Sequence, residues 1–366
     1  MRRLFWERIR RLDWVLLVTA LALAGIGLVT IYSVDLSRGI ERSFFNTQAV
    51  SLLLGVSVAL AAAHIHLSRY EKSARFLFLV ALLLLIGVLF FGTTIRGTRG
   101  WYRLAGFSFQ PVEIAKVVLI IFLAWRIERA GRQFAQTKFL WATGIMSALL
   151  VLPVLLQPDF GSGAVMLAVW LGLVLVAGLK PKTIAILATV GMLTVAFSWI
   201  FLFKDYQRER ILNFANPDRD PLGTGYNVNQ SLIAIGSGQF FGRGLGSGSQ
   251  SQLHFLPEAQ TDFILAVVGE ELGFVGLALL LGLYGVVFSR LIRIARLAPS
   301  DFGAYTAAGV VILLSVQLTV NAGAAMGLLP VTGVTLPFVS YGGTSLISNF
   351  LLIGIAESVA AQTRAV

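Results

Sequence analysis

Apolar runs alternate with short polar segments along most of this chain. They cover residues 14–33, 48–67, 76–92, 110–127, 139–156, 162–178, 183–203, 263–289, 305–327 and 343–361. A helix of about 20 apolar residues crosses the ~30 Å hydrocarbon core of a bilayer. Because backbone groups in that core must pair internally, runs this apolar are expected to be helices. The pattern predicts an all-α polytopic membrane protein with ten transmembrane helices.

One long polar segment interrupts this pattern. It spans residues 204–262, between the seventh and eighth runs, and is rich in glycine. The connections between the other runs are short, so we expect residues 1–366 to form a single transmembrane domain in which 204–262 folds as a lid. Chemistry or recognition is expected at this segment, because functional residues concentrate on loops held by a rigid scaffold.

Composition agrees with the membrane class. Mean hydropathy is +0.81, 57% of residues are hydrophobic and 13% are charged, against about a quarter charged in soluble domains. The alternating pattern of a membrane β-barrel is absent. The first run is long and leads into further runs without a small-residue cleavage site, which argues against a cleaved signal peptide.

The distribution of Lys and Arg predicts the orientation. With both termini in the cytoplasm, 18 of the 29 Lys and Arg residues fall on the inner side. Ten fall outside, five of them in the long segment, where the rule has little force. The long segment is therefore predicted to be extracytoplasmic.

The net charge of +11 has a topological explanation, because most of it is this cytoplasmic excess. Such an excess also favours anionic membrane lipids. Residues 1–13 are rich in arginine and predict an amphipathic cytoplasmic anchor, with a partner contact as the alternative. No basic soluble fold of the kind that binds nucleic acid is present, so no nucleic-acid partner is expected.

Several chemistries are excluded by what the sequence lacks. Without cysteine there are no disulfides and no thiolate chemistry. No Walker A phosphate loop occurs, and the glycine tract 236–248 does not satisfy G-x-G-x-x-G, since Phe241 and Ser247 occupy the required third positions. If bonds are made outside the cell, the substrate must therefore arrive already activated.

Two charges lie inside the fourth run. Glu113 and Lys116 are one turn apart on one face of the predicted helix. Intramembrane charges cost on the order of 2.5–3.5 kcal/mol each and usually face a partner or a cavity. The pair is either a self-neutralising structural contact or the lining of a polar cavity open to the outside. Both alternatives stay open from the sequence.

The segment before the fourth run carries arginines on the predicted outer side, against the positive-inside trend. Arg99 and Trp101 lie in Gly97-Thr98-Arg99-Gly100-Trp101. Arginine forks suit phosphate, and Trp suits a sugar ring or the membrane interface. We expect an anionic ligand here.

These motifs resemble those of the SEDS family (shape, elongation, division and sporulation). The matching segments are 97–101, 109–116, 157–162, 226–232, 256–263 and 330–343, in family order over nearly the whole chain. Residues 249–255 are more similar to the elongation branch than to the division branch. Ala259 departs from the family, which commonly has His or Gln there.

The resemblance implies a peptidoglycan glycosyltransferase in the bacterial cytoplasmic (inner) membrane. Such an enzyme joins lipid II units by β-1,4 bonds on the extracytoplasmic face, with inversion and release of undecaprenyl diphosphate. The family also implies a class B penicillin-binding protein and other elongation-complex proteins as partners, alongside membrane lipids. A lipid II flippase or a non-catalytic scaffold of the cell-wall complex would be the alternative functions.

By match to the family, Asp262 corresponds to the catalytic aspartate and would be the general base. It could instead ligate Mg²⁺ or Mn²⁺ at the diphosphate or cap the helix that follows. The expected substrate-contacting or cavity-lining residues are Glu113, Lys116, Arg99, Trp101, Arg210 and Glu258, with Lys116 and Arg210 as contacts of the diphosphate. No cofactor is certain, and a divalent cation is possible.

Overall fold

The computed structural model describes residues 11–37, 43–95, 97–104, 107–131, 137–201, 208–209, 212, 214, 224–253 and 255–363. Most of the predicted N-terminal anchor and Arg210 therefore lie outside the described residues.

Each of the ten apolar runs overlaps one long helix. These helices are α2 (Trp14–Ser37), α3 (Ser43–His64), α4 (Leu67–Phe91), α5 (Pro111–Ala130), α6 (Thr137–Leu156), α7 (Phe160–Gly178), α8 (Pro181–Phe201), α12 (Ile264–Leu297), α13 (Asp301–Ala325) and α14 (Gly343–Thr363). Eight helices are long and apolar enough to cross a membrane over their described residues. The chain is a multi-pass membrane protein. Helices α5 and α8 are not among the eight, so the count of ten spans stays a prediction.

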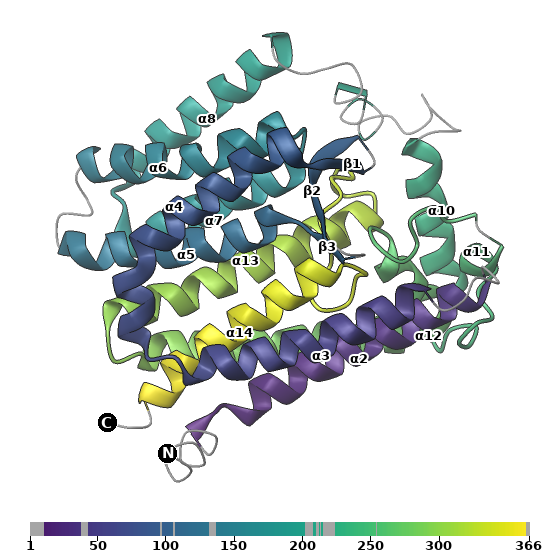
Figure 1. Cartoon of the computed structure of the whole chain (residues 1–366). Helices are drawn as coiled ribbons and strands as arrows, with labels where there is room; N and C mark the ends of the chain where they lie inside the picture. Colours follow the sequence, from purple (N-terminus) through teal and green to yellow (C-terminus); the bar gives the residue numbers. More distant parts are fainter. Residues whose placement is uncertain are drawn as a thin grey trace.

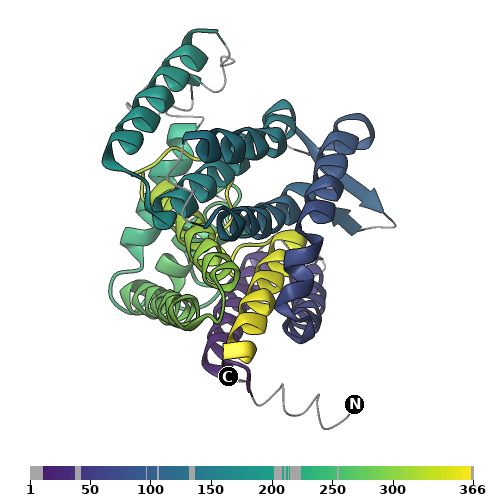
Figure 2. The same ribbon diagram turned by 90° about the vertical axis from the view of Figure 1, so that its left-hand side faces the viewer.

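The long helices run side by side, and the bundle has two distinct ends (Figure 1). The start of α2 and the end of α14 lie at one end. At the other end lie the strands β1 (Thr93–Ile95), β2 (Thr98–Leu104) and β3 (Phe107–Phe109), which form an antiparallel sheet in sequence order. Helix α8 stands apart from the rest of the bundle in both views (Figure 2). The sheet end is the predicted outer side.

Close helix contacts hold α14 in the centre. At Gly354 an added Cβ would lie 2.3 Å from the Ala59 carbonyl oxygen, so glycine lets α14 touch the α3 backbone. Small residues at such crossings are the usual means of helix association in membranes.

The predicted inner end is closed by a charged junction. The Asp13 amide donates to Glu357 Oε2 at 2.7 Å, and Arg290 Nε donates to Asp13 Oδ2 at 2.9 Å. This junction joins the start of α2 to the C-terminal parts of α12 and α14. Because Asp13 is 3% exposed, its carboxylate is compensated rather than solvated.

Within residues 204–262 the described part is not simply a loop. It contains α10 (Thr224–Ser237) and the short α11 (Ser249–Gln252). Between these two helices, residues 238–248 wind around α12. The expectation of a folded segment rather than an open loop is met over this part.

The reason for the winding is a break in α12. Gly273 has φ +64°, which interrupts the helix two residues after the pair Glu270-Glu271. The N–H groups of Phe274 and Val275 donate to the carbonyls of Gln239 and Phe240, at 2.9 and 3.1 Å. The glycine-rich segment thus replaces the hydrogen bonds that the break removes.

The other side of the break is satisfied in the same way. The carbonyls of Glu270 and Glu271 accept from the N–H groups of Arg243 and Gly244, each at 3.0 Å. At Gly242 an added Cβ would lie 2.1 Å from the Glu271 carbonyl oxygen, which explains the glycine there. Unpaired backbone groups in a membrane domain cost several kcal/mol each, so this wrapping is a condition for the break.

The carboxylates at the break are bound by the same segment. Glu270 accepts from the Gln250 and Ser251 N–H groups at 2.7 and 3.0 Å. Glu271 accepts from the Gly246 N–H at 3.2 Å. The glycine tract therefore binds the buried Glu271 side chain, and α11 binds that of Glu270.

We predict that Gly273→Ala destabilises the protein by about 1 to 3 kcal/mol. The left-handed backbone disfavours any side chain, and the new Cβ would meet the Gly242 nitrogen at 2.3 Å. Thermal unfolding in detergent measures the effect. The matched control is Gly282→Ala on the same helix, where nothing lies within 4 Å of the new Cβ. An equal melting temperature for the two variants would contradict this account of the break.

Candidate active site

Asp262 lies in a tight turn, residues 258–263, immediately before α12. The helix begins at Ile264 with Phe263 as its N-cap. Asp262 therefore lies one residue before the N-cap position of α12. Its side chain is half-buried and belongs to the turn rather than to the helix.

Glu258 shapes the start of this turn. Its backbone has φ +53°, in the left-handed region. Its carbonyl accepts from the Thr261 N–H at 3.0 Å, and its Oε2 accepts from Thr261 Oγ1 at 3.1 Å. These bonds close the turn on itself. A role of Glu258 toward substrate stays a prediction.

Three consecutive carbonyls of the turn are bound from elsewhere in the chain. Gln260 accepts from the Tyr341 N–H at 2.8 Å, Thr261 from Ser340 Oγ at 2.6 Å, and Asp262 from Asn321 Nδ2 at 3.1 Å. We refer to these three bonds as the carbonyl clamp. They fix the backbone of the turn, and hence the point from which the Asp262 side chain projects.

The clamp donors are themselves held. From α3, Gln48 Nε2 donates to the Ser340 carbonyl at 3.0 Å and its Oε1 accepts from the Gly342 N–H at 3.1 Å. From α13, Asn321 Nδ2 also donates to the Val334 carbonyl at 2.9 Å. The C-terminal loop 326–342 is therefore fixed to both helices. Through Ser340 and Tyr341, the same loop binds the turn.

Glu113 and Lys116 form the predicted pair at the start of α5. Lys116 Nζ donates to Glu113 Oε1 at 2.8 Å, and the residues are 3% and 6% exposed. The structure thus shows that Glu113 and Lys116 form a buried ion pair. Whether the pair also lines a substrate cavity stays a prediction.

The packing of α13 against α5 relates this pair to the turn. Gly309 lies against Ile120, where an added Cβ would be 2.5 Å from Ile120 Cγ2. The two helices are antiparallel. About 12 Å outward from that contact, α5 reaches its first turn and α13 reaches Gln317. One further turn along α13 is Asn321. The clamp and the pair are therefore at neighbouring levels near the sheet end.

Buried polar atoms without partners gather on this stretch of α13. They are Gln317 Oε1 and Nε2 and Asn321 Oδ1. Gln317 is fully buried. Buried polar atoms are nearly always hydrogen-bonded, so water or a polar ligand is expected to complete them. Neither residue was singled out from the sequence, although each is a polar residue inside an apolar run, the signal that identified Glu113 and Lys116.

In the structure, Arg99 and Trp101 make contacts within the sheet and with the end of α4. Arg99 Nη2 and Nε donate to the carbonyls of Phe90 and Gly92, at 2.8 and 3.0 Å, which satisfies the end of α4. The Trp101 carbonyl accepts from Thr93 Oγ1 at 3.1 Å. The expected contact of these two residues with an anionic ligand stays a prediction.

The sequence expectations for Arg210 and for a metal are not settled by this geometry. Arg210 lies outside the described residues. Among the residues that the structure describes, no three His, Asp or Glu side chains converge to hold a metal ion. Asp262 as a ligand to Mg²⁺ or Mn²⁺ stays a prediction, with any further ligands supplied by substrate or water.

We predict that Asn321→Ala loosens the turn without unfolding the bundle. The Asp262 and Val334 carbonyls would each lose a donor, at about 1–3 kcal/mol per unsatisfied buried group. Hydrogen–deuterium exchange measures it, with faster exchange expected in 258–263 and 334–342. Asn229→Ala, at an exposed position of α10, is the control. Unchanged exchange in both segments would rule out the clamp as drawn.

This chain is similar to known proteins over nearly its full length. The family described as "Cell cycle protein", comprising FtsW, RodA and SpoVE, matches residues 13–365. The peptidoglycan glycosyltransferase MrdB of Escherichia coli K12 is 37% identical, over 98% of this chain and 95% of that one. A probable peptidoglycan glycosyltransferase FtsW of Geobacter metallireducens is 36% identical, over 98% and 97%.

Solved structures show the same fold. One chain of a peptidoglycan synthase complex, from work on how polymerization and crosslinking are coordinated, superposes with a TM-score of 0.82 at 32% identity, covering 96% of this chain and 98% of that one. The rod shape determining protein RodA of Thermus thermophilus gives 0.72 at 31% identity, covering 95% and 96%. Sequence and fold together place this chain in the SEDS family of FtsW, RodA and SpoVE.

Proposed function

We propose that this chain is a peptidoglycan glycosyltransferase that polymerises lipid II at the outer face of the cytoplasmic membrane. The family and the glycosyltransferase names of its relatives support the activity. The observation that carries the assignment of the site is the carbonyl clamp, which holds an aspartate at a fixed point near the sheet end of the bundle.

The reaction is a single displacement at the anomeric carbon. The 4-hydroxyl oxygen of the acceptor sugar forms the new β-1,4 bond as the bond from the donor anomeric carbon to the diphosphate oxygen breaks. Inversion follows, because the diphosphate is α-linked. The electron pair leaves with undecaprenyl diphosphate, and the hydroxyl proton passes to a base. No nucleotide is consumed, in agreement with the absence of a Walker A motif.

In this proposal Asp262 is the base. A positioned carboxylate that takes the acceptor proton contributes about 10²–10⁴-fold. Its efficiency depends on distance and angle to the hydroxyl, which is what the clamp on its backbone controls. The turn that carries Asp262 directly precedes α12, which begins at Ile264.

Lys116 and Arg210 are the proposed cations for the diphosphate, and Arg99 and Trp101 the outer contacts of the substrate. Lys116 is paired with Glu113 before substrate arrives. A divalent cation at Asp262 and the diphosphate would supply further charge. Glu113 would then hold the ammonium in position.

The proposed partner is a class B penicillin-binding protein that cross-links the strands as they form. One solved relative comes from a peptidoglycan synthase complex, which supports assembly with such an enzyme. Relatives named FtsW and MrdB match about equally well. We assign the elongation role on the segment 249–255, and cell-shape defects on depletion would test that choice.

Asp262→Ala is expected to abolish strand formation by purified protein given labelled lipid II. The rate should fall by about 10²–10⁴-fold, with the melting temperature kept within a few degrees. Asp301→Ala, an exposed aspartate at the other end of the bundle, is the matched control and should polymerise normally. Equal rates for wild type and Asp262→Ala would remove Asp262 from the mechanism. Strands from neither, with lipid II crossing liposomes instead, would favour the flippase.

The buried pair gives a second, separable test. Glu113→Gln alone leaves a buried ammonium unpaired and should cost about 3–5 kcal/mol of stability. The double variant Glu113→Gln with Lys116→Met removes both charges and should recover much of that loss. Its polymerisation rate should nevertheless stay about 10²-fold low, because a cation at the diphosphate is gone. A double variant as active as wild type would make the pair purely structural.

A further inference from the structure

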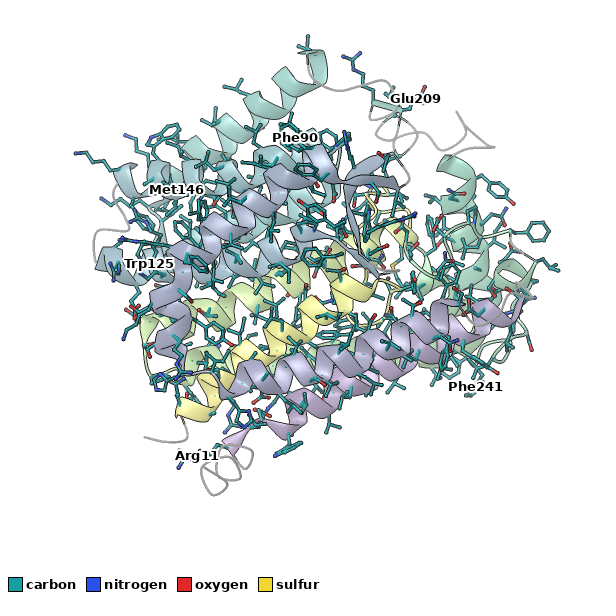
Figure 3. The ribbon with its side chains drawn as sticks, in the orientation of Figure 1. Arg11, Phe90, Trp125, Met146, Glu209 and Phe241 are labelled. Atoms are coloured by element: carbon teal, nitrogen blue, oxygen red, sulfur yellow. The ribbon has the colours of Figure 1, made fainter. Side chains whose placement is uncertain are left out.

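Three arginines surround one buried indole at the end of the bundle opposite the sheet. Trp125, near the end of α5, is 4% exposed. The guanidinium carbons of Arg75, Arg129 and Arg126 lie 4.8, 5.0 and 5.8 Å from its ring centroid. Figure 3 places Trp125 at the end of the bundle far from Phe241, the end at which α2 begins. We call these four residues the arginine cluster.

The protein neutralises this charge only in part: Glu128 lies within electrostatic range of Arg129, and Glu71 and Asp301 lie within range of Glu128. Within the described part of the chain, none of the three guanidiniums forms an ion pair with a carboxylate. The adjacent Glu128 directs Oε1 to the Phe302 N–H at 3.3 Å, at the start of α13. One aromatic ring attracts a nearby cation by about 0.5–1 kcal/mol at exposed sites. It offsets only part of the mutual repulsion of three, so a bound anion would stabilise the cluster further.

The arginine cluster lies beside one end of an exposed apolar stripe on α4. Along α4, Phe76, Leu79, Leu83 and Phe90 are 67%, 53%, 59% and 68% exposed. Their spacing puts them on one stripe of the helix. Lys72 is exposed one turn before Phe76, at the inner end of the stripe. An elongated apolar chain lying on this stripe would bring its polar head to Lys72 and Arg75.

We propose that the arginine cluster is a binding site for the phosphate headgroup of an anionic phospholipid, with its acyl chains along the exposed stripe of α4. Guanidinium forks donate paired hydrogen bonds to phosphate oxygens, which distinguishes this site from a general positive surface. The cluster lies on the side predicted to be cytoplasmic, where basic residues near the membrane attract anionic lipid. The site lies at the opposite end of the bundle from Asp262 and does not depend on the glycosyltransferase assignment.

The test compares lipid retention by the purified full-length chain in detergent. Native mass spectrometry counts bound phosphatidylglycerol and phosphatidylcholine with identical acyl chains. The cluster variant is Arg75→Gln/Arg126→Gln/Arg129→Gln. The control, Lys180→Gln/Lys182→Gln/Arg293→Gln, removes the same charge from exposed positions on the same side. Both must match wild type in melting temperature. If the cluster variant does not fold, Arg75→Gln alone replaces it, with Arg293→Gln as control.

Wild type and control should retain phosphatidylglycerol over phosphatidylcholine. The cluster variant should bind phosphatidylglycerol about tenfold to a hundredfold more weakly, since each basic residue near the surface contributes about 1 kcal/mol. Equal retention by the cluster variant and wild type would overturn the proposal, as would an equal loss in the control. Displacement of the lipid by inorganic phosphate at the same concentration would show a phosphate site without a lipid contribution, and would also overturn it.

Discussion

The rest of the proposed site depends on the carbonyl clamp. Three successive carbonyls, of Gln260, Thr261 and Asp262, accept hydrogen bonds from the C-terminal loop and from α13. Each would otherwise be a buried acceptor without a donor, at about 1–3 kcal/mol. Since Gln48 binds the same loop from α3, a helix near the N-terminus also supports the turn. Segments from across the chain thus converge on one aspartate.

The break in α12 is the second constraint, and it explains the long polar segment. A chain without cysteine must hold such a segment by packing and hydrogen bonds, as expected. It does so by pairing residues 239–244 with the groups that Gly273 leaves open, and by binding the carboxylates of Glu270 and Glu271. Helix α12 starts directly after the Asp262 turn. The hydrogen bonds of residues 239–244 therefore also stabilise the helix that follows the proposed site.

Much of the fold could be predicted, because a helix must be long and apolar to cross a bilayer. The lengths of the apolar runs therefore indicate where the long helices lie. The Glu113–Lys116 contact followed from spacing on one helix. The break at Gly273 could not be predicted, since a glycine in a membrane helix usually serves close helix packing. The clamp was also missed, because residues 321 and 340 meet the turn 258–263 only in three dimensions. Asp262 itself came from the family resemblance, and its role stays a prediction.

The central claim is that the clamp acts as one unit on Asp262. The most direct measurement is the lipid II polymerisation rate of Asn321→Ala, Ser340→Ala and the double variant. Once one donor is lost and the turn is free, losing the other should add little, so the double variant should be slowed by clearly less than the product of the single effects. Single effects that multiply would mean that the two donors act independently, and would contradict the account.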